Sequence, residues 1–162
     1  MCSSDLASAW QRERAAEVRG GGFEALAVLQ HPPVFTFGMR ARPEHLLEPV
    51  DAIEERGGHV VHSDRGGDIT FHGPGQLVAY PILDLRGRGL GPATYVRMLE
   101  RTILEMLARF GVHARQVEGR PGVWVGDEKI AALGVRVREG VSTHGIAINV
   151  TTDLDWFDAI VP

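Results

Sequence analysis

The chain has 162 residues, of which 44% are hydrophobic and 23% charged, with a formal net charge of −4 and a single cysteine, Cys2. This length and apolar content suit one domain with one core, and the acidic balance excludes an overall basic field for wrapping nucleic acid. One cysteine excludes an intramolecular disulfide. The sequence shows no apolar run of about 18 residues and no leader pattern, so we expect a cytoplasmic protein without a membrane span.

The N-terminal quarter predicts one helix and two extended pieces. Residues 1–6 read unlike the start of a folded domain, and we expect them to be foreign to it. Good helix formers predict a helix over residues 7–18, which the glycines at 20–22 end. Residues 23–30 and 34–38 are β-type sequence and flank a rigid His-Pro-Pro turn.

Residues 44–56 predict a short amphipathic helix that is broken or restarted at Pro49, because proline suits a first helical turn. A strand over residues 59–62 follows. His59 and His62 are three residues apart, so on a strand they point to opposite faces, and we reject a zinc site there.

Residues 65–76 read Arg-Gly-Gly-Asp-Ile-Thr-Phe-His-Gly-Pro-Gly-Gln, which excludes a helix interior and predicts a loop, followed by a buried strand over residues 77–85. Bare glycine amides can approach a ligand closely and donate to an anion or a polarised carbonyl. Arg65 and His72 flank these amides. The alternative is a plain glycine-rich turn with an incidental histidine, but the density of glycine favours a binding loop.

The C-terminal half predicts a helix, a hairpin and a further strand. Apolar residues at steps of three and four predict a helix over residues 92–110 that packs on a sheet: Val96, Leu99, Ile103, Met106, Leu107 and Phe110. Residues 123–125 and 129–137 flank Gly126-Asp127 and predict a hairpin with a two-residue turn, and residues 143–150 predict another strand. The expected fold class is therefore α/β (α+β), with a mixed, largely antiparallel sheet and packed helices.

The stretch from Arg65 to Tyr80 resembles the signature of the lipoyl(octanoyl) transferases, Arg-Gly-Gly-x-x-Thr-aromatic-His-Gly-Pro-Gly-Gln-x-x-x-Tyr, at every fixed position. The segment that begins at His31 also resembles this family, with Gln30 in place of the usual acid. Related adenylating lipoate ligases typically carry His-Asp in this loop, so the transferases fit better. The resemblance extends with varying strength over residues 7–162 and implies a fold similar to the biotin/lipoate protein ligases.

Residues 129–135 resemble the family segment that carries the catalytic lysine, although a lysine near a hairpin turn would otherwise be read as a solvated surface residue. Residues 144–150 resemble the strand whose main chain lines the acyl pocket. The resemblance therefore implies Lys129 as a catalytic residue. From the residue pattern alone, each residue of the implied substrate site could equally be ordinary core or loop. The substrate-binding residues that the resemblance implies are Arg65, Gly66, Gly67, Asp68, Ile69, Thr70, Phe71, His72, Ala132, Leu133, Gly134, Gly145, Ile146 and Ala147.

The chemistry implied by the resemblance is a two-step acyl transfer without metal or ATP. A cysteine thiolate attacks octanoyl-acyl-carrier protein, and a lysine of a lipoyl domain then takes the acyl group; the acceptors are the 2-oxoacid dehydrogenases and the glycine-cleavage H protein. The ammonium of Lys129 lowers the thiol pKa, and its amine later accepts a proton. Amides near Gly66-Gly67 or Leu133-Gly134 are candidates for the oxyanion donors. We expect a monomer.

Residues 155–162 resemble the family segment that leads directly into a Cys-Gly pair, whose cysteine is the nucleophile, so that cysteine is expected just after Pro162. Cys2 lies at the opposite terminus without a motif and is a poor substitute. We expect residues 1–162 to be a single acyltransferase domain, incomplete at its C-terminus and inactive by itself. The alternatives are an ATP-dependent lipoate or biotin ligase, a non-enzymatic lipoyl-domain or acyl-chain binding protein, and an unstable fragment.

Overall fold

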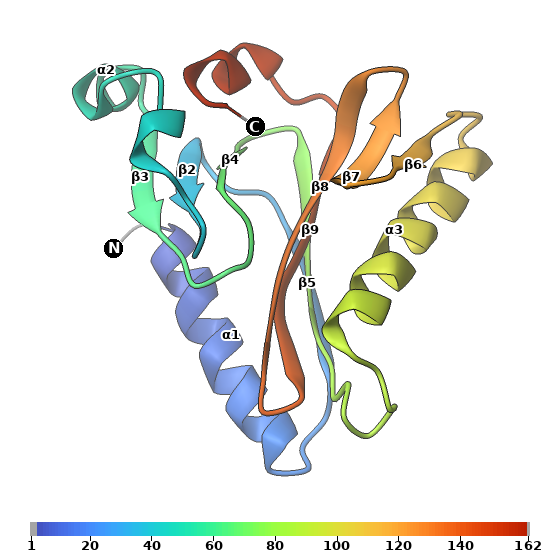
Figure 1. Ribbon diagram of the computed structural model, residues 1–162. Helices are drawn as coiled ribbons and strands as arrows, with labels where there is room; N and C mark the ends of the chain where they lie inside the picture. The colour runs from blue at the N-terminus through green and yellow to red at the C-terminus, as the bar shows by residue number, and fades with distance from the viewer. Residues whose placement is uncertain (1–2, 162) are drawn as a thin grey trace.

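The computed structural model describes residues 3–161, and its largest element is a six-stranded antiparallel sheet (Figure 1). From one edge to the other the strands are β1 (Ala25–Leu29), β5 (Gln76–Ile82), β9 (Val141–Asn149), β8 (Glu128–Arg138), β7 (Arg120–Val125) and β6 (Arg115–Val117). The turn between β7 and β8 is Gly126-Asp127, as the sequence predicts, whereas β6 was not foreseen. The sheet and its packed helices confirm the expected fold class.

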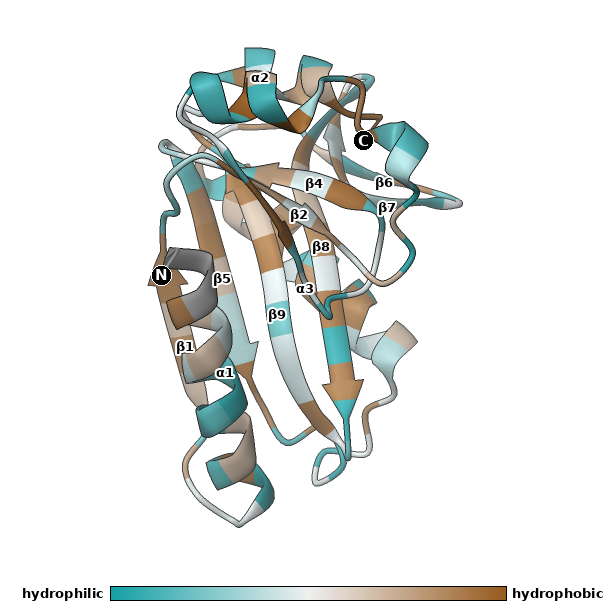
Figure 2. Ribbon diagram, turned by 90° about the vertical axis from the view of Figure 1, so that its left-hand side faces the viewer, coloured by the Kyte–Doolittle hydropathy of each residue, from teal (hydrophilic) through white to brown (hydrophobic). Residues whose placement is uncertain are grey.

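A second, three-stranded sheet has the order β3 (His59–His62), β2 (Val34–Phe37) and β4 (Ile69–His72), with β2 parallel to β3 and antiparallel to β4. Figure 2 shows this sheet crossing in front of β8 and β9, on the side where α1 also lies. Strand β4 falls within residues 65–76, so the prediction of a loop there was wrong for its centre. The sequence Ile-Thr-Phe-His has high β propensity, and β2 supplies the hydrogen-bonding partner.

Two long helices, α1 (Ser3–Arg19) and α3 (Pro92–Arg109), cover opposite faces of the large sheet (Figures 1 and 2). Helix α1 contributes Ala15 and Val18 to a small core, and α3 contributes Ile103 and Leu107 to a larger one. Phe110 was predicted to belong to the buried stripe of α3 but is 77% exposed, because the helix ends at the residue before it. Within residues 3–161, no helix combines the length and the apolar character needed to cross a membrane.

Three short helical segments surround the small sheet: η1 (Pro43–His45), α2 (Val50–Glu55) and η2 (Leu154–Ala159). Pro49 is the N-cap of α2, which confirms the predicted break at this residue. Trp156 of η2 stacks on Phe71 of β4, with ring centroids 5.2 Å apart and 7° between the ring planes. Phe35 packs against both rings, so the small sheet has an aromatic core of its own.

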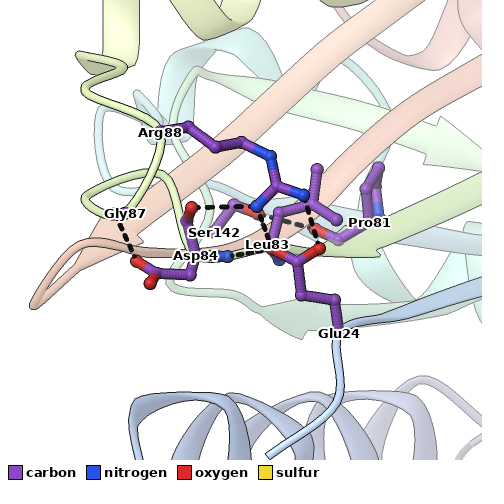
Figure 3. Close-up of polar contacts among 7 residues, drawn as sticks. All are labelled: Glu24, Pro81, Leu83, Asp84, Gly87, Arg88 and Ser142. Carbon is purple, nitrogen blue, oxygen red and sulfur yellow. Dashed lines mark hydrogen bonds and ion pairs between the residues drawn. The ribbon is translucent and has the colours of Figure 1, made fainter. Parts of the chain in front are cut away.

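The end of the large sheet farthest from β4 is closed by polar contacts between side chains and loops (Figure 3). Glu24 accepts from the backbone N–H of Asp84 at 2.8 Å and from Nη2 of Arg88 at 2.7 Å. The hydroxyl of Ser142 accepts from the N–H of Leu83 at 3.0 Å and donates to the carbonyl of Pro81 at 2.8 Å. These contacts tie the loop after β5 to the starts of β1 and β9.

Candidate active site

A cavity of about 610 Å³ opens between the glycine-rich segment, strands β8 and β9, and η2. It brings together residues that lie more than sixty positions apart in the sequence, because β4 and its flanking loop cross over β8. Eleven of the predicted site residues line it: Arg65, Gly66, Gly67, Asp68, Ile69, Thr70, Lys129, Ala132, Leu133, Gly134 and Ala147. The predicted lysine and most of the predicted loop therefore face one space.

A smaller cavity of about 60 Å³ lies beside the first and shares part of its wall, including Arg65, Ala132 and Ala147. Three further predicted site residues line only this smaller space: His72, Gly145 and Ile146. Ser8 and Gln11 of α1 also line it. The inner cavity therefore lies between the two sheets and α1.

Phe71 lines neither cavity, although it was predicted to contact substrate. Successive side chains of a strand point to opposite faces, and β4 directs Phe71 into the aromatic core, where it is 1% exposed. Thr70 and His72, its neighbours on β4, face the cavities instead. Phe71 therefore supports the site from behind.

Arg65 holds the glycine-rich loop in shape from inside. Its Nε donates to Oγ1 of Thr36 at 2.9 Å, its Nη2 donates to the carbonyls of Thr36 and Asp68 at 2.6 and 2.7 Å, and its Nη1 donates to the carbonyl of Gly66 at 3.0 Å. Burial lowers the pKa of Arg65 to about 10, so the guanidinium keeps its charge at neutral pH. The loop is closed around a buried cation whose hydrogen-bond acceptors are all uncharged oxygens.

His72 belongs to a buried chain of hydrogen bonds. Gln76 donates from Nε2 to Oδ1 of Asn149 at 2.9 Å and to the carbonyl of Phe71 at 3.2 Å, so its Oε1 is the acceptor that lies 2.7 Å from Nδ1 of His72. His72 therefore donates from Nδ1. Burial lowers its pKa to about 3, and the ring is neutral at physiological pH. Gln76 and Asn149 are cross-strand partners on β5 and β9, which fixes this geometry.

Polar side chains that the sequence analysis did not propose as site residues complete the inner wall. Nε2 of His31 lies 2.8 Å from the hydroxyl of Tyr80, and Nε2 of His144 lies 2.6 Å from Oδ1 of Asp64. His144 has a left-handed backbone with φ of 58°, and its N–H donates to Oε1 of Gln11 on α1 at 2.6 Å. A strained residue held both by α1 and by the loop at Asp64 is typical of functional sites. These hydrogen bonds join residues that are 49 to 133 positions apart, so no local sequence pattern predicts them.

Lys129 is the only lysine in the sequence, and its side chain is half-buried at the edge of the larger cavity. The register shifts between Val123 and Trp124 on β7, and such a bulge re-aims neighbouring side chains. Nζ of Lys129 lies 5.0 Å from the centre of the Trp124 ring, which Arg120 also approaches to 4.4 Å. Burial, and then the charge of Arg120, lower the pKa of Lys129. The amine is therefore easier to deprotonate than that of an exposed lysine.

A glycine-rich loop and a single lysine face one cavity beside a large antiparallel sheet, and the comparisons identify the class of protein that has this arrangement. The chain belongs to the family of the lipoyl protein ligase A/B catalytic domain, whose model matches residues 5–162. It is 49% identical over 150 residues to the octanoyltransferase of Halorhodospira halophila, covering 93% of this chain and 64% of that protein. It is 48% identical over 161 residues to the octanoyltransferase of Chloroflexus aurantiacus, covering 96% of this chain and 72% of that protein.

Solved structures share the fold at lower sequence identity. A lipoate-protein ligase A bound with ATP superposes with a TM-score of 0.73 and 19% identity, covering 94% of this chain and 67% of that one. A bipartite lipoate protein ligase from Thermoplasma acidophilum, studied with its E2 lipoyl domain, gives a TM-score of 0.72 and 19% identity, covering 96% and 63%. The fold expected from the resemblance is confirmed.

Proposed function

We propose that the chain is the catalytic domain of an octanoyltransferase, which carries an octanoyl or lipoyl group from acyl-carrier protein to a lysine of a lipoyl domain. The observation that carries this proposal is the half-buried amine of Lys129, which shares a cavity with the glycine-rich loop. The identity to octanoyltransferases supports the reaction, although this chain spans only 64% to 72% of the length of the two relatives described above.

The acyl chain occupies the apolar part of the larger cavity in this proposal. Ile69, Ala132, Leu133 and Ala147 supply its walls. Small side chains on β8 and β9 leave room for an extended hydrocarbon, which gains free energy by leaving water. The neutral polar groups around His72 then lie toward the far end of the chain.

The nucleophile in this proposal is a cysteine that directly follows Pro162 in the full-length protein. Its thiolate, stabilised by the ammonium of Lys129, attacks the carbonyl carbon of the carrier thioester, and the C–S bond to the carrier breaks. The departing carrier thiolate takes a proton from Lys129. The product is an acyl-cysteine beside a neutral lysine amine.

The second half-reaction returns the cysteine to its thiolate form and Lys129 to its ammonium form. The amine of the acceptor lysine attacks the acyl-cysteine, the C–S bond breaks, and Lys129 accepts the proton from the attacking nitrogen. The lowered pKa of Lys129 favours this base role. Gly67 is the better oxyanion donor of the glycine pair, because the N–H of Gly66 already donates to the carbonyl of Val135 at 3.1 Å.

The partners remain predictions: octanoyl-acyl-carrier protein as donor, and lipoyl domains of 2-oxoacid dehydrogenases and the glycine-cleavage H protein as acceptors. A monomer in the cytoplasm is likewise predicted. Support for a lipoyl-domain acceptor comes from the Thermoplasma ligase, which is described together with its E2 lipoyl domain.

The test begins with the source DNA read through the codon after Pro162. The full-length protein is then incubated with octanoyl-acyl-carrier protein and analysed by mass spectrometry for an octanoyl adduct on the proposed cysteine. Lys129→Met is expected to abolish adduct formation. Lys129→Arg keeps a positive charge but cannot act as a base, so it is expected to accumulate the adduct and fail to pass it on.

Three outcomes would overturn the proposal. The first is a stop codon after Pro162, which would favour a binding protein without a nucleophile. The second is octanoylation that depends on ATP and proceeds through an adenylate, which would favour a ligase. The third is a Lys129→Met enzyme with unchanged rates for both half-reactions.

A further inference from the structure

Glu100 is a buried carboxylate on α3, on the face of the large sheet opposite the glycine-rich loop. It is 8% exposed on a helix whose other buried residues are Tyr95, Ile103 and Leu107. Its Oε1 accepts from the backbone N–H of Gly122 at 3.0 Å, and its Oε2 accepts from Nε2 of Gln116 at 2.8 Å. A buried carboxylate is costly unless it is fully hydrogen-bonded, so a specific role is expected for it.

Gly122, the residue that Glu100 holds, lies directly against the side chain of Lys129. A Cβ atom built on Gly122 would lie 3.2 Å from Cδ and 3.3 Å from Cγ of Lys129, and 2.8 Å from the carbonyl of Ala131. Gly122 has φ of 126°, a conformation that only glycine adopts readily. The lysine stem therefore packs on bare backbone at this point.

The N–H of Gly122 donates to the helix side chain, just before the register shift on β7. A bulged strand lacks the regular ladder that would otherwise fix its backbone. Glu100 supplies the missing restraint by tying the strand before the bulge to α3. Trp124, whose ring lies beside Nζ of Lys129, follows two residues after Gly122.

We propose that Glu100 is a positioning residue for Lys129: its hydrogen bond to Gly122 fixes the backbone on which the lysine stem packs and thereby holds the amine at the cavity. The catalytic meaning of this role rests on the proposed function, but the positioning itself does not. Arg120 is the charged group that shares the Trp124 ring with the amine. The other charged groups that line the same cavity are Arg40, Arg65, Asp68 and Glu128. Glu100 acts on the amine through the backbone.

The test uses the 162-residue chain and needs no acyl transfer. Because Lys129 is the only lysine, [¹³C]lysine labelling yields one ε-CH₂ signal, whose pH titration reports the environment of this amine. In the native chain we expect a pKa below the value of about 10.4 for an exposed lysine. In Glu100→Ala strand β7 loses its tie to α3, and the pKa of Lys129 is expected to rise toward about 10.4.

Two variants serve as controls. Glu100→Gln retains an oxygen that accepts from Gly122, so the titration of Lys129 is expected to match the native chain. Glu105→Ala removes an exposed carboxylate of the same helix, which pairs with Arg101. This variant is also expected to leave the titration of Lys129 unchanged. If Glu100→Ala fails to fold, Gly122→Ala tests the same contact. Its Cβ would lie 2.8 Å from the carbonyl of Ala131 and 3.2 Å from Cδ of Lys129, so the backbone must move against the lysine stem and shift the titration of Lys129.

An unchanged Lys129 titration in folded Glu100→Ala would overturn the proposal, and so would an unchanged titration in Gly122→Ala. A Glu100→Gln chain that behaves like Glu100→Ala would also overturn it, because the charge rather than the hydrogen bond would then be decisive. Failure of the acyl-transfer experiment leaves these titrations as they are, so the two proposals fail separately.

Discussion

Two arginines, one beside the cavity and one at the far end of the large sheet, hold the chain around them in opposite ways. Arg65, at the cavity, is 6% exposed and donates only to uncharged oxygens, those of Thr36 on β2 and of the loop that it shapes. Arg88, at the other end, is exposed and pairs with the carboxylate of Glu24 (Figure 3). Water solvates the second cation almost as well as its partner does, whereas the first depends on the protein alone. The cavity end is therefore the less tolerant of change.

Arg65→Met is expected to have the largest effect. The carbonyl of Thr36 loses its charged donor, and the carbonyl of Asp68 keeps the backbone N–H of Gly38 at 3.2 Å but loses the guanidinium. Removing these buried charged hydrogen bonds costs about 3 kcal/mol or more of the free energy of unfolding. Urea denaturation measures this loss. A free energy of unfolding within about 1 kcal/mol of that of the native chain would show that the loop does not depend on the guanidinium.

Acid is expected to weaken the cavity end first. The pKa of His72 is about 3 in the folded chain, below its usual 6.5, so the unfolded chain binds the proton first and stability falls as the pH drops below 6.5. The loss reaches roughly 2 kcal/mol by pH 5. Glu24 has a pKa lowered from 4.5 chiefly by its hydrogen bond to Arg88, so its contribution is lost only in stronger acid.

His72→Asn tests this assignment by urea denaturation at pH 7 and pH 5. The asparagine amide can donate near the position of Nδ1 but does not titrate, so the loss between the two pH values is expected to be smaller than in the native chain. His31 and His144, whose pKa values burial also lowers, retain part of the slope. An identical slope in the variant would remove His72 from the acid response.

Gly66→Ala is expected to disturb the loop moderately. A Cβ at this position would lie 2.8 Å from the carbonyl of Val135, so the loop must shift, at a cost on the order of 1–3 kcal/mol. Gly91→Ala, before α3 at the opposite end, is the matched control because its Cβ meets open space. Thermal unfolding compares the two variants, and equal midpoints would contradict a close contact between loop and sheet.

Arg88→Met is expected to have the smallest effect. The ion pair with Glu24 is exposed, and such pairs contribute little to stability, least of all at high salt. Thermal unfolding at low and high salt is expected to show a midpoint close to that of the native chain in both. A large loss would mean that the far end of the sheet is as sensitive as the cavity end.

The sequence by itself determined most of the local elements, the fold class and the family. The spacing of apolar residues located α3, the Gly-Asp pair located the β7–β8 turn, and Pro49 marked the start of α2. These features depend on neighbours within a few positions, so a local pattern carries them. The motif around Arg65 and the segment at Lys129 indicated the family, which the comparisons confirm.

Only the tertiary structure decided which residues face which neighbour. The local pattern did not show that Phe71 and His72 have different surroundings. In the structure, Phe71 packs in the aromatic core behind β4, whereas His72 lines the inner cavity. The contact between Glu100 and Gly122 links a helix on one face of the sheet to the strand that supports Lys129. Such pairings join residues that are distant in sequence, and their free energy depends on burial and alignment that exist only once the sheets have packed.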